Sequence, residues 1–395
     1  IFVCMTDFHD ALQIVLDHAT PAGTEVISLE DACGRILSSD IKAPADMPPF
    51  SKSAMDGYAC RKEDTENGME ILEVIAAGRL PVHEIIPGTC SKIMTGALLP
   101  RGANAVLMVE NATLRKGRVY GPRPGSDNII RQGEDLKAGE PVLRAGTLLQ
   151  PQHLSLMAMC GITAVAVSRE ITVGVLSTGD ELIEPGTPAL TGKIYNSNSW
   201  QLVAMMRQIG AIPTYYGIAA DSVEETHRLL RTALNASQVV ILTGGVSEGD
   251  YDRVPGVIRE LGFEILFDRV RVQPGKPTTF AISSSTGKFI FGLPGNPVSS
   301  FVQCKLLVHP FLAAMQGARL EPITTLLPLK GEYTRRKAER MAHIPIHINP
   351  DGTCSTITYN GSAHLAALSA AHGLGRIPVG VQSIRNGEKI QVLLF

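Results

Sequence analysis

The sequence lacks the cysteine pattern of a disulfide framework or of a structural zinc site. Its seven cysteines are odd in number, are scattered along 395 residues, and never follow the C-x-x-C spacing. Such usage is typical of a reducing compartment, so we expect a cytoplasmic protein. No signal peptide is recognisable, and no apolar stretch reads as long and uninterrupted enough to span a bilayer, so no membrane partner is expected.

An excess of charge of one sign is also missing. The 36 basic and 38 acidic residues give a formal net charge of −2. This balance provides no global attraction for nucleic acid or for an anionic membrane surface. The chain has no P-loop, no G-x-G-x-x-G spacing, no internal repeat and no low-complexity run. The common nucleotide-binding fingerprints are therefore excluded.

The composition that is present is ordinary for a globular protein, with 44% hydrophobic and 19% charged residues. The length predicts about two or three domains. A helix from Phe8, a strand at 24–29 and a short helix at 30–37 open the chain. Short strands at regular spacing between 60 and 150 indicate a small inserted barrel or sandwich.

The middle of the chain alternates strands with helices. A buried strand in "ITVGVLSTGDEL" precedes a helix at 197–210 that Gly210 should terminate, and three more strand–helix units follow. This alternation predicts a doubly wound parallel sheet over about 171–319, with a ligand at the carboxyl ends of its strands. The pattern then returns to strands and turns, which predicts a terminal β domain. The fold class is thus α/β and β multidomain.

Turns rich in glycine and carboxylates follow these strands. They are "STGDEL", "GIAAD", "LTGGVSEGDYD", "PGKP" and "LPGNP". Backbone N–H groups in such turns favour phosphate, and clustered carboxylates beside a phosphate require a hard cation such as Mg²⁺. The combination indicates an anionic, phosphate-bearing ligand. Any single aspartate in these turns is also explained as a cap or turn residue.

The run "PPFSKSAMDGYA" (residues 48–59) raises the same question for Asp56. Asp-Gly is ordinary turn chemistry, because aspartate can bond its own backbone and glycine takes positive φ at little cost. The residues alone leave open whether Asp56 serves the turn or a reaction.

Other polar and aromatic clusters have simple structural interpretations. His343 and His347 share a strand face, where packing is favoured over metal ligation. The basic run Arg335, Arg336, Lys337 and Arg340 is expected to be a solvated face, although it could attract an oxyanion. Trp200 and the methionines around Met205 are expected in the core. Ser222 and Glu225 form a capping box.

Taken in order, these motifs resemble those of molybdopterin molybdenumtransferases, the MoeA family shared with the E domain of gephyrin. The resemblance covers nearly the whole chain. It is carried by "PPFSKSAMDGYA", "IMTGALLPRGANAVLMVE", "IRQGEDL", "STGDEL", "LTGGVSEGDYD", "PGKP", "LPGNPVSS" and "GSAHLAALSAAHGL".

The resemblance implies a four-part subunit. Residues 1–170 would be an N-terminal linker region with a β subdomain inserted at about 45–142. Residues 171–320 would be the α/β molybdopterin-binding domain, and residues 321–395 a C-terminal β-barrel. The protein would be a homodimer with its active site at the subunit interface. It would act as a molybdopterin molybdotransferase that takes molybdate and adenylyl-molybdopterin, with Mg²⁺, and releases AMP.

The family motifs also assign residues. The catalytic polar set would be Asp56, Thr95, Asp135, Glu181, Asp221 and Asp250. Of these, Glu181, Asp221 and Asp250 would hold Mg²⁺ and recognise the substrate. Ligand binding would fall to Gly179, Asp180, Gly244, Gly245, Ser247, Lys276, Pro294, Gly295, Asn296, Pro297 and Ser362. Asp56 would reach into the cleft of the partner subunit.

The sequence departs from the family pattern at four positions. Gln273 replaces a common lysine, and His343 lies where an arginine is frequent, so positive charge near the oxyanion is reduced. Glu248 adds negative charge to a phosphate-binding turn, and His372 replaces a frequent asparagine. These departures bear on oxyanion affinity more than on the fold, and a histidine could supply a cation only when protonated.

Two other functions are compatible with the same α/β domain. One is an enzyme that only adenylylates molybdopterin, which would need neither the "MDGYA" region nor a terminal barrel. The other is a non-catalytic paralogue that binds the cofactor or acts as a scaffold, as gephyrin does at membrane-receptor assemblies. The retained Asp56 and carboxylates favour the molybdenumtransferase. Its transient partners would be the molybdopterin adenylyltransferase and the acceptor molybdoenzymes.

Overall fold

The structure, a computed structural model, describes residues 5–188, 190–245, 254–319, 322–359 and 361–395. The chain forms two compact units. The larger unit comprises Ile1–Ser38, Ala145–Leu149 and Val165–Phe395, and the smaller unit comprises Ser39–Arg144 and Gln150–Ala164. The segments of the smaller unit are therefore inserted into the sequence of the larger one. The finer division into four parts stays a prediction.

A six-stranded sheet forms the centre of the larger unit, in the order β16-β13-β17-β21-β20-β18. The strands are β13 (Thr172–Thr178), β16 (Ile212–Ala219), β17 (Val239–Thr243), β18 (Glu264–Arg269), β20 (Pro277–Ser283) and β21 (Lys288–Leu293). The first four in spatial order are parallel, but β20 pairs antiparallel with both β21 and β18. The expectation of a wholly parallel sheet was wrong here, because the short turn at 284–287 can only join antiparallel strands.

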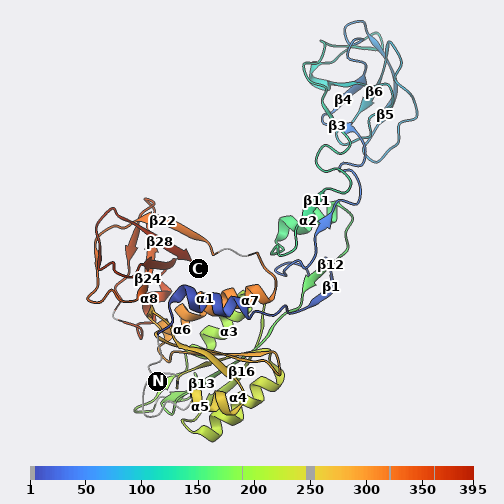
Figure 1. Cartoon of the computed structure of the whole chain (residues 1–395). Coiled ribbons are helices and arrows are strands. Elements are labelled where there is room, and N and C mark those ends of the chain that lie inside the picture. The colour runs from blue at the N-terminus through green and yellow to red at the C-terminus, as the bar shows by residue number, and fades with distance from the viewer. Residues whose placement is uncertain (1–4, 189, 246–253, 320–321, 360) are drawn as a thin grey trace. The chain divides into compact units, whose positions relative to one another are not determined.

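Helices cover both faces of this sheet (Figure 1). One face carries α1 (Phe8–Asp17), α3 (Asn198–Gln208) and a long helix built from α6 (Pro297–Gln303), the π-helical turn η2 (Cys304–Val308) and α7 (His309–Met315). The other face carries α4 (Val223–Ala236) and α5 (Val254–Glu260). Successive strand residues point to opposite faces, so each strand must be apolar on both. The doubly wound α/β fold is confirmed.

The long helix Pro297–Met315 is long and apolar enough to cross a membrane by length and composition. The expectation that no stretch meets this requirement was therefore wrong. However, 67% of the helix is buried inside the protein, and Leu307, Phe311 and Leu312 are fully buried in the main core. It is the core helix of the larger unit, not a membrane span.

The C-terminal part of the larger unit is a second sheet, in the order β19-β24-β26-β28-β22, with β25 paired to β24. Its strands are β19 (Val272–Gln273), β22 (Thr324–Pro328), β24 (Met341–Ile348), β25 (Cys354–Thr356), β26 (Gly373–Ile377) and β28 (Lys389–Leu394). A bridge between Leu329 and Cys354 joins the β22 side to β25. The sheet thereby closes on itself, as the expected barrel requires. The pair β23 (Tyr333–Thr334) and β27 (Ser383–Ile384) and the helix α8 (Ala366–Ser369) complete this part.

The smaller unit contains another six-stranded sheet, in the order β7-β4-β6-β5-β9-β8. Its strands are β4 (Gly57–Cys60), β5 (Met69–Ile75), β6 (Thr89–Ile93), β7 (Ala105–Met108), β8 (Thr113–Arg115) and β9 (Arg118–Tyr120), with η1 (Val109–Asn111) after β7. Two short antiparallel pairs join β2 (Ile41–Lys42) to β11 (Pro141–Leu143) and β3 (Lys52–Ser53) to β10 (Ile129–Ile130). The helix α2 (Pro151–Met159) also belongs to this unit.

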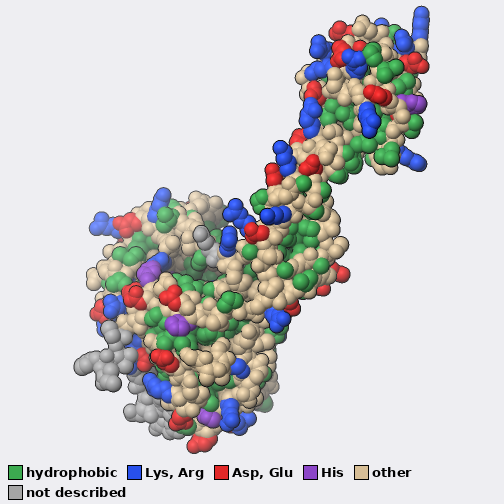
Figure 2. All heavy atoms as spheres, turned by 45° about the vertical axis from the view of Figure 1, so that its right-hand side comes forward, with side chains coloured by type: hydrophobic (Ala, Val, Ile, Leu, Met, Phe, Trp, Pro, Cys, Tyr) green, Lys and Arg blue, Asp and Glu red, His purple; other side chains and the backbone are tan. Residues whose placement is uncertain are grey.

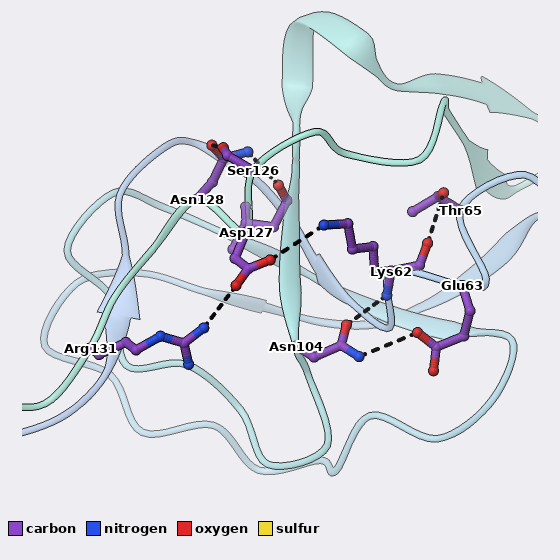
Figure 3. A network of polar contacts seen from close by, with 9 residues as sticks. Lys62, Glu63, Thr65, Asn104, Ser126, Asp127, Asn128 and Arg131 are labelled. Atoms are coloured by element: carbon purple, nitrogen blue, oxygen red, sulfur yellow. Dashed lines mark hydrogen bonds and ion pairs between the residues drawn. The ribbon is translucent and has the colours of Figure 1, made fainter.

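A polar network ties the loops of the smaller unit together (Figure 3). Asp127 accepts from Lys62 at 3.5 Å and from Arg131 at 2.8 Å. Asn104 accepts from the Lys62 backbone N–H and donates to Glu63. Every charged group of this network bonds with another of its members, so the network serves to hold these loops together.

Several smaller expectations were wrong. Residues 30–37 form turns and the bridges Ile36–Leu148 and Leu37–Val167 instead of a helix, because Gly34 adopts a φ of +82°. Trp200 is 53% exposed and its ring contacts that of Tyr215 at a tilt of 46°, whereas Met205 and Met206 are buried as expected. Acidic and basic side chains are interspersed on the face shown in Figure 2, without a single-sign stripe.

Two pairs of strands complete the described fold. β1 (Thr24–Ser28) pairs with β12 (Ala164–Ser168), and β14 (Leu182–Ile183) pairs with β15 (Ile194–Tyr195). The Ser222 hydroxyl accepts from the Glu225 backbone N–H, which confirms the expected cap of α4. The π-helical turn η2 was not expected from the sequence.

Candidate functional site

A cavity of about 550 Å³ opens at the carboxyl ends of β13, β17 and β21. β13 is followed by β16 on one side, and the chain then returns to place β17 on the other side. Such a reversal of strand order creates a crevice at the strand ends. The lining residues are Thr178, Gly179, Glu181, Leu182, Ile194, Tyr195, Asn196, Ser197, Asn198, Asp221, Thr243, Gly244, Gly245, Pro277, Pro294, Gly295, Asn296, Pro297 and Ala363.

Gly244 is required by the close approach of two strand ends. It has a φ of +88°, and a Cβ on it would lie 2.4 Å from the carbonyl oxygen of Thr178. Both facts exclude a side chain without a local shift of the backbone. The Gly-Gly turn therefore lets the ends of β13 and β17 meet at the wall of the cavity.

A buried hydroxyl network fixes the floor of the cavity. The Ser177 hydroxyl bonds with those of Ser199 and Thr243 at 2.8 and 3.0 Å, and donates to Asn196 at 3.1 Å. The Asn196 amide donates to the Tyr215 hydroxyl at 2.8 Å, and that hydroxyl donates to Glu184. Burial, and then the bond to Glu184, raise the pKa of Tyr215. Its phenol therefore stays protonated and holds Asn196 in place.

Two polar atoms of the cavity wall have no partner among the described residues. The Thr178 hydroxyl and the Asn198 side-chain oxygen are buried and make no hydrogen bond. The Asn198 amide nitrogen meanwhile donates to the Gly295 carbonyl at 2.8 Å, which fixes the oxygen in position. Buried polar groups are nearly always satisfied, so these atoms indicate a polar ligand.

Sequence reasoning missed Thr178, Asn196 and Asn198. The available signal was "YNSNS" immediately before α3, where polar residues cluster ahead of an apolar helix. That pattern is also what an ordinary helix start looks like, so it did not stand out.

Three carboxylates gather at the ends of β13 and β16. The Asp180 backbone N–H donates to the Asp221 carboxylate at 3.2 Å, and the Asp221 N–H donates to the Asp180 carboxylate at 3.0 Å. This reciprocal pair fixes the two loops. Glu181 and Asp221 line the cavity, and Lys193 donates to the Asp180 carbonyl.

Hard oxygen donors of this kind fit Mg²⁺. Among the described residues, no group of three or more His, Cys, Asp and Glu side chains is arranged to hold a metal ion. Glu181 and Asp221 thus place two carboxylates in the wall of the cavity, one fewer than the three predicted ligands. The third predicted ligand, Asp250, lies outside the described residues, as do Ser247 and Glu248.

The remaining predicted binding residues of the larger unit lie at or beside the cavity. Gly179, Gly245, Pro294, Gly295, Asn296 and Pro297 line it, together with Gly244. Lys276 directly precedes the lining residue Pro277, and its carbonyl accepts from the Val270 N–H at 2.9 Å. The Ser362 carbonyl accepts from the Val298 N–H at 3.1 Å, next to the lining residue Ala363.

In the smaller unit, the structure brings Asp56 and Thr95 together. The Asp56 Oδ1 accepts from the Thr95 backbone N–H at 2.7 Å and from its hydroxyl at 2.9 Å. These two bonds, backbone first, lower the pKa of Asp56. The carboxylate is exposed and ionised, and it is aimed by the turn that follows β6.

The turn at Asp56 differs from the expected Asp-Gly chemistry. Gly57 does not adopt a positive φ. A Cβ on Gly57 would instead lie 2.2 Å from the Leu107 carbonyl oxygen, so glycine is needed for the close approach of β7. The Asp56 side chain bonds Thr95, and not its own turn. A local turn role therefore does not account for the Asp56 carboxylate.

Asp135 follows β10, and β10 pairs with β3, the strand that comes shortly before Asp56. Its backbone N–H donates to the Met47 carbonyl at 3.0 Å, just ahead of the proline pair that leads to Asp56. The side chain of Asp135 is exposed. Asp56 and Asp135 thus follow the paired strands β3 and β10, and Thr95 follows β6.

Three of the four positions that depart from the family pattern, Gln273, His343 and His372, lie in the C-terminal sheet or beside it, and the fourth, Glu248, lies outside the described residues. Gln273 and His343 line a second cavity, of about 400 Å³, in the larger unit. His343 is 2% exposed, and burial lowers its pKa to about 3, so it is neutral near pH 7. The rings of His347 and His372 lie with their centroids 4.6 Å apart and are tilted by 38°. Arg335 donates to the carbonyls of Val381, Arg340 and Pro378, so its guanidinium has a structural role in joining these backbone segments.

Three family models match the chain in succession. They are the MoeA N-terminal region (domain I and II) over residues 6–161, a probable molybdopterin binding domain over 174–314, and the MoeA C-terminal region (domain IV) over 328–395. A molybdopterin molybdenumtransferase of Staphylococcus epidermidis is 32% identical over 399 residues, which cover 93% of this chain and 90% of that protein. A putative molybdopterin biosynthesis protein of Methanocaldococcus jannaschii is 35% identical over 380 residues, with 93% and 92% covered.

Solved structures agree with these matches. The crystal structure of a molybdopterin biosynthesis MoeA protein from Pyrococcus horikoshii OT3 aligns with a TM-score of 0.87 at 32% identity, and 99% of this chain and 100% of that chain are covered. Matches of this extent, which follow one order along the whole chain, show that the chain belongs to the MoeA family of molybdopterin molybdenumtransferases.

Proposed function

We propose that the chain is a transferase of molybdenum cofactor biosynthesis that inserts molybdate into adenylylated molybdopterin, with Mg²⁺, and releases AMP. Membership of the family supports the reaction class, since the relatives from Staphylococcus epidermidis and Bacillus subtilis are named molybdopterin molybdenumtransferase. The main support for substrate binding is the strand-end cavity, in which the Thr178 hydroxyl and the Asn198 side-chain oxygen have no partner among the described residues. A ligand rich in polar groups would satisfy both atoms.

The shape and polarity of the cavity suit a pyrophosphate-bearing ligand. The first residues of α3 and of the long helix, Asn198 and Pro297, both line it. Helix N-termini carry partial positive charge and favour phosphate. The volume lies within the range of small-molecule sites, roughly 300–1,000 Å³. The ligand's phosphates would lie at the Gly-rich turns.

Glu181 and Asp221 would hold Mg²⁺ when the substrate is bound, together with Asp250. The ion would neutralise the charge of the pyrophosphate. The Asp180 backbone N–H orients the Asp221 carboxylate, and the Asp221 N–H orients that of Asp180 in return. The residues of this chain thus bind and orient the phosphates before reaction.

Asp56 would act at the reacting centre as an ionised carboxylate. The two bonds from Thr95 fix its direction and keep it deprotonated. Such a group can orient a nucleophile or accept its proton. We propose that the enzyme is a homodimer in which Asp56, Thr95 and Asp135 of one subunit complete the cavity of the other.

Molybdate, the second substrate, would be held by N–H groups, hydroxyls and cations. Gln273 and the neutral His343 bring no positive charge to this dianion near pH 7. We therefore expect weaker molybdate binding than a site with two more cations would give. In the cytoplasm, transient contacts with the molybdopterin adenylyltransferase and with acceptor molybdoenzymes would deliver substrate and collect product.

An AMP-release assay tests this function. The protein is mixed with adenylylated molybdopterin, Mg²⁺ and molybdate, and AMP is measured. We expect release that requires both molybdate and Mg²⁺. Absent or molybdate-independent release contradicts the proposal, and ATP-dependent formation of the adenylylated pterin would indicate an adenylyltransferase.

Matched acid-to-amide variants locate the site. Asp56→Asn and Glu181→Gln should each lower AMP release about 100-fold or more, because each removes a charge at the reacting centre. The controls Glu66→Gln and Glu339→Gln change exposed acids of the smaller and larger units and should leave the rate unchanged. Equal losses in the controls would contradict the assignment.

A further inference from the structure

A separate cavity of about 370 Å³ lies in the larger unit, away from the strand-end cavity. Its wall combines α1, the π-helical turn η2 with the start of α7, and the strands β22, β24, β26 and β28 of the C-terminal sheet. Figure 1 shows α1 running along α7 beside this sheet. The apolar part of the wall is formed by Phe8, Leu12, Leu306, Pro310 and Leu393.

Cationic side chains line the same cavity without acidic ones. Lys305 and Arg376 are both half-buried in its wall, and none of the described lining residues is Asp or Glu. Arg376 bonds with the His9 imidazole at 3.0 Å and donates to the Gln391 amide oxygen at 3.4 Å, neither of which is an acid, and its guanidinium lies 5.9 Å from the Phe8 ring centre. These contacts hold the guanidinium in place but leave its charge uncompensated. Partly desolvated cations favour a bound anion.

A buried imidazole supplies an independent sign of a ligand. His343 is 2% exposed and lines this cavity, and its Nδ1 has no hydrogen-bond partner among the described residues. A neutral imidazole nitrogen can donate to an oxygen atom of a ligand. His343 also borders the second cavity, so the orphan atom alone does not decide between the two. The uncompensated cations decide in favour of the α1 side.

Lys305 lines the cavity from the π-helical turn η2. The His309 N–H donates to the Cys304 carbonyl, five residues back, instead of to Lys305. Pro310 has no N–H to offer the Leu306 carbonyl, which accounts for the widened turn. Lys305 and Leu306, both in this turn, line the cavity.

We propose that this cavity binds a small amphipathic carboxylate. The apolar wall would take an alkyl or aryl chain, and Lys305, Arg376 and His343 would take the carboxylate. Charge complementarity identifies the head group, because a cationic site without acids excludes an amine or a divalent cation. A cavity of this volume accommodates a small molecule rather than a folded partner. A phosphate dianion is disfavoured, since one lysine and one partly engaged arginine would compensate its charge poorly.

Calorimetric titration with sodium octanoate tests this site, without substrates or molybdate. The proposal therefore does not rest on the transferase function, and either can fail alone. We expect one octanoate per chain, with a Kd of about 0.1–1 mM for ten non-hydrogen atoms. Acetate, which lacks the chain, and octanol, which lacks the charge, should bind at least about tenfold more weakly. Octyl phosphate distinguishes a carboxylate site from a general anion site.

Charge-removing variants locate the binding. Lys305→Met and Arg376→Gln should each weaken octanoate binding about tenfold, which is the loss of one charge-assisted bond. The matched control Lys337→Met removes an exposed lysine of the same unit and should leave the affinity unchanged. Circular dichroism confirms that each variant is folded, and Leu12→Glu, which places an acid in the cavity wall, provides a second test should one variant unfold.

Several outcomes would overturn the proposal. They are octanoate affinity that is unchanged in both charge variants and in Leu12→Glu, octanol binding as tightly as octanoate, and octyl phosphate binding more tightly than octanoate. The first outcome places the ligand elsewhere, the second makes the cavity merely apolar, and the third makes it a phosphate site. Loss of affinity in Lys337→Met to the same degree would also contradict it.

Discussion

The Asp56 carboxylate receives both hydrogen bonds that Thr95 can donate, from its backbone N–H at 2.7 Å and its hydroxyl at 2.9 Å. The two residues lie 39 positions apart, so the contact depends on the pairing of β4 with β6. An exposed carboxylate that needs two donors to hold its direction is positioned for a task beyond its own turn. The contact also gives Asp56 a lowered pKa, and this can be tested.

Thr95→Val should raise the pKa of Asp56 toward its ordinary value, because it removes the hydroxyl donor but keeps the backbone one. The acidic limb of the pH profile of AMP release should then move to higher pH. Thr95→Ser keeps the hydroxyl and should retain the wild-type profile. An acidic limb that is identical in the valine variant would show that Asp56 does not set it.

The lowered pKa of Asp56 also determines how its contribution to stability changes with pH. Because the pKa of Asp56 is lowered from 3.8 on folding, the native state gains stability above that value. This gain is lost as the pH falls below it through the folded-state pKa. Asp56 is fully exposed, so the effect belongs to the activity profile and not to an appreciable loss of fold.

Mixing two inactive variants tests whether Asp56 acts across a dimer. If Asp56 completes the partner's cavity, a heterodimer of Asp56→Asn and Glu181→Gln subunits has one intact site of its two. Random mixing makes half of the dimers hetero, so about a quarter of wild-type AMP release should return. Sedimentation measures the dimer itself. No recovery in a mixture shown to exchange subunits would place Asp56 in its own subunit's site or outside the site.

Thr178→Val should weaken ligand binding without lowering stability. The Thr178 hydroxyl is buried at the cavity and has no partner, so the isosteric methyl removes no bond within the protein. Thr279 is the matched control, since its hydroxyl is also buried without a partner but does not line the cavity. Melting temperature and the affinity for adenylylated molybdopterin are measured for both. Equal loss of affinity in Thr279→Val would remove the special role of Thr178.

Gly244→Ala should destabilise the larger unit and deform the cavity. The new Cβ would lie 2.4 Å from the Thr178 carbonyl oxygen, on a backbone with φ of +88°. Gly262→Ala has a similar φ of +82° and nothing within 4 Å, so it isolates the backbone strain alone. We expect a cost of about 1–2 kcal/mol for Gly262→Ala and a larger one for Gly244→Ala, measured by denaturant unfolding. An equal loss of stability in the two variants would mean that the ends of β13 and β17 can move apart without cost.

The sequence predicted the four parallel strands of the central sheet, because residues such as Val239–Thr243 are buried on both faces and form continuous apolar runs. It did not predict β18 and β20, which complete the sheet. It also predicted most of the strand-end turns. It failed at 30–37, where an apparent helical pattern gives way to tertiary pairing of Ile36 and Leu37. Local preference loses to long-range pairing at such positions.

The site was only partly predictable for a related reason. Glycines and carboxylates of the turns can be recognised from residue type, but the importance of Thr178 and Asn198 arises from burial without a partner. That property depends on which atoms of distant segments surround them. Gly57 shows the same limit, because its requirement comes from the Leu107 carbonyl of a neighbouring strand and not from its own turn.

The buried His343 should make the larger unit lose stability on mild acidification. Burial lowers its pKa from 6.5 to about 3, so the unfolded chain binds a proton that the native state does not. Stability should therefore fall as the pH drops below 6.5 and level off near the folded-state pKa, at up to about 1.4 kcal/mol per pH unit from this residue. Trp200, the single tryptophan, reports unfolding of this unit by fluorescence. His343→Gln should flatten the decline between pH 7 and about 5, whereas His83→Gln, on the surface of the smaller unit, should not. An unchanged slope in His343→Gln would mean that the imidazole gains its proton without cost in the native state.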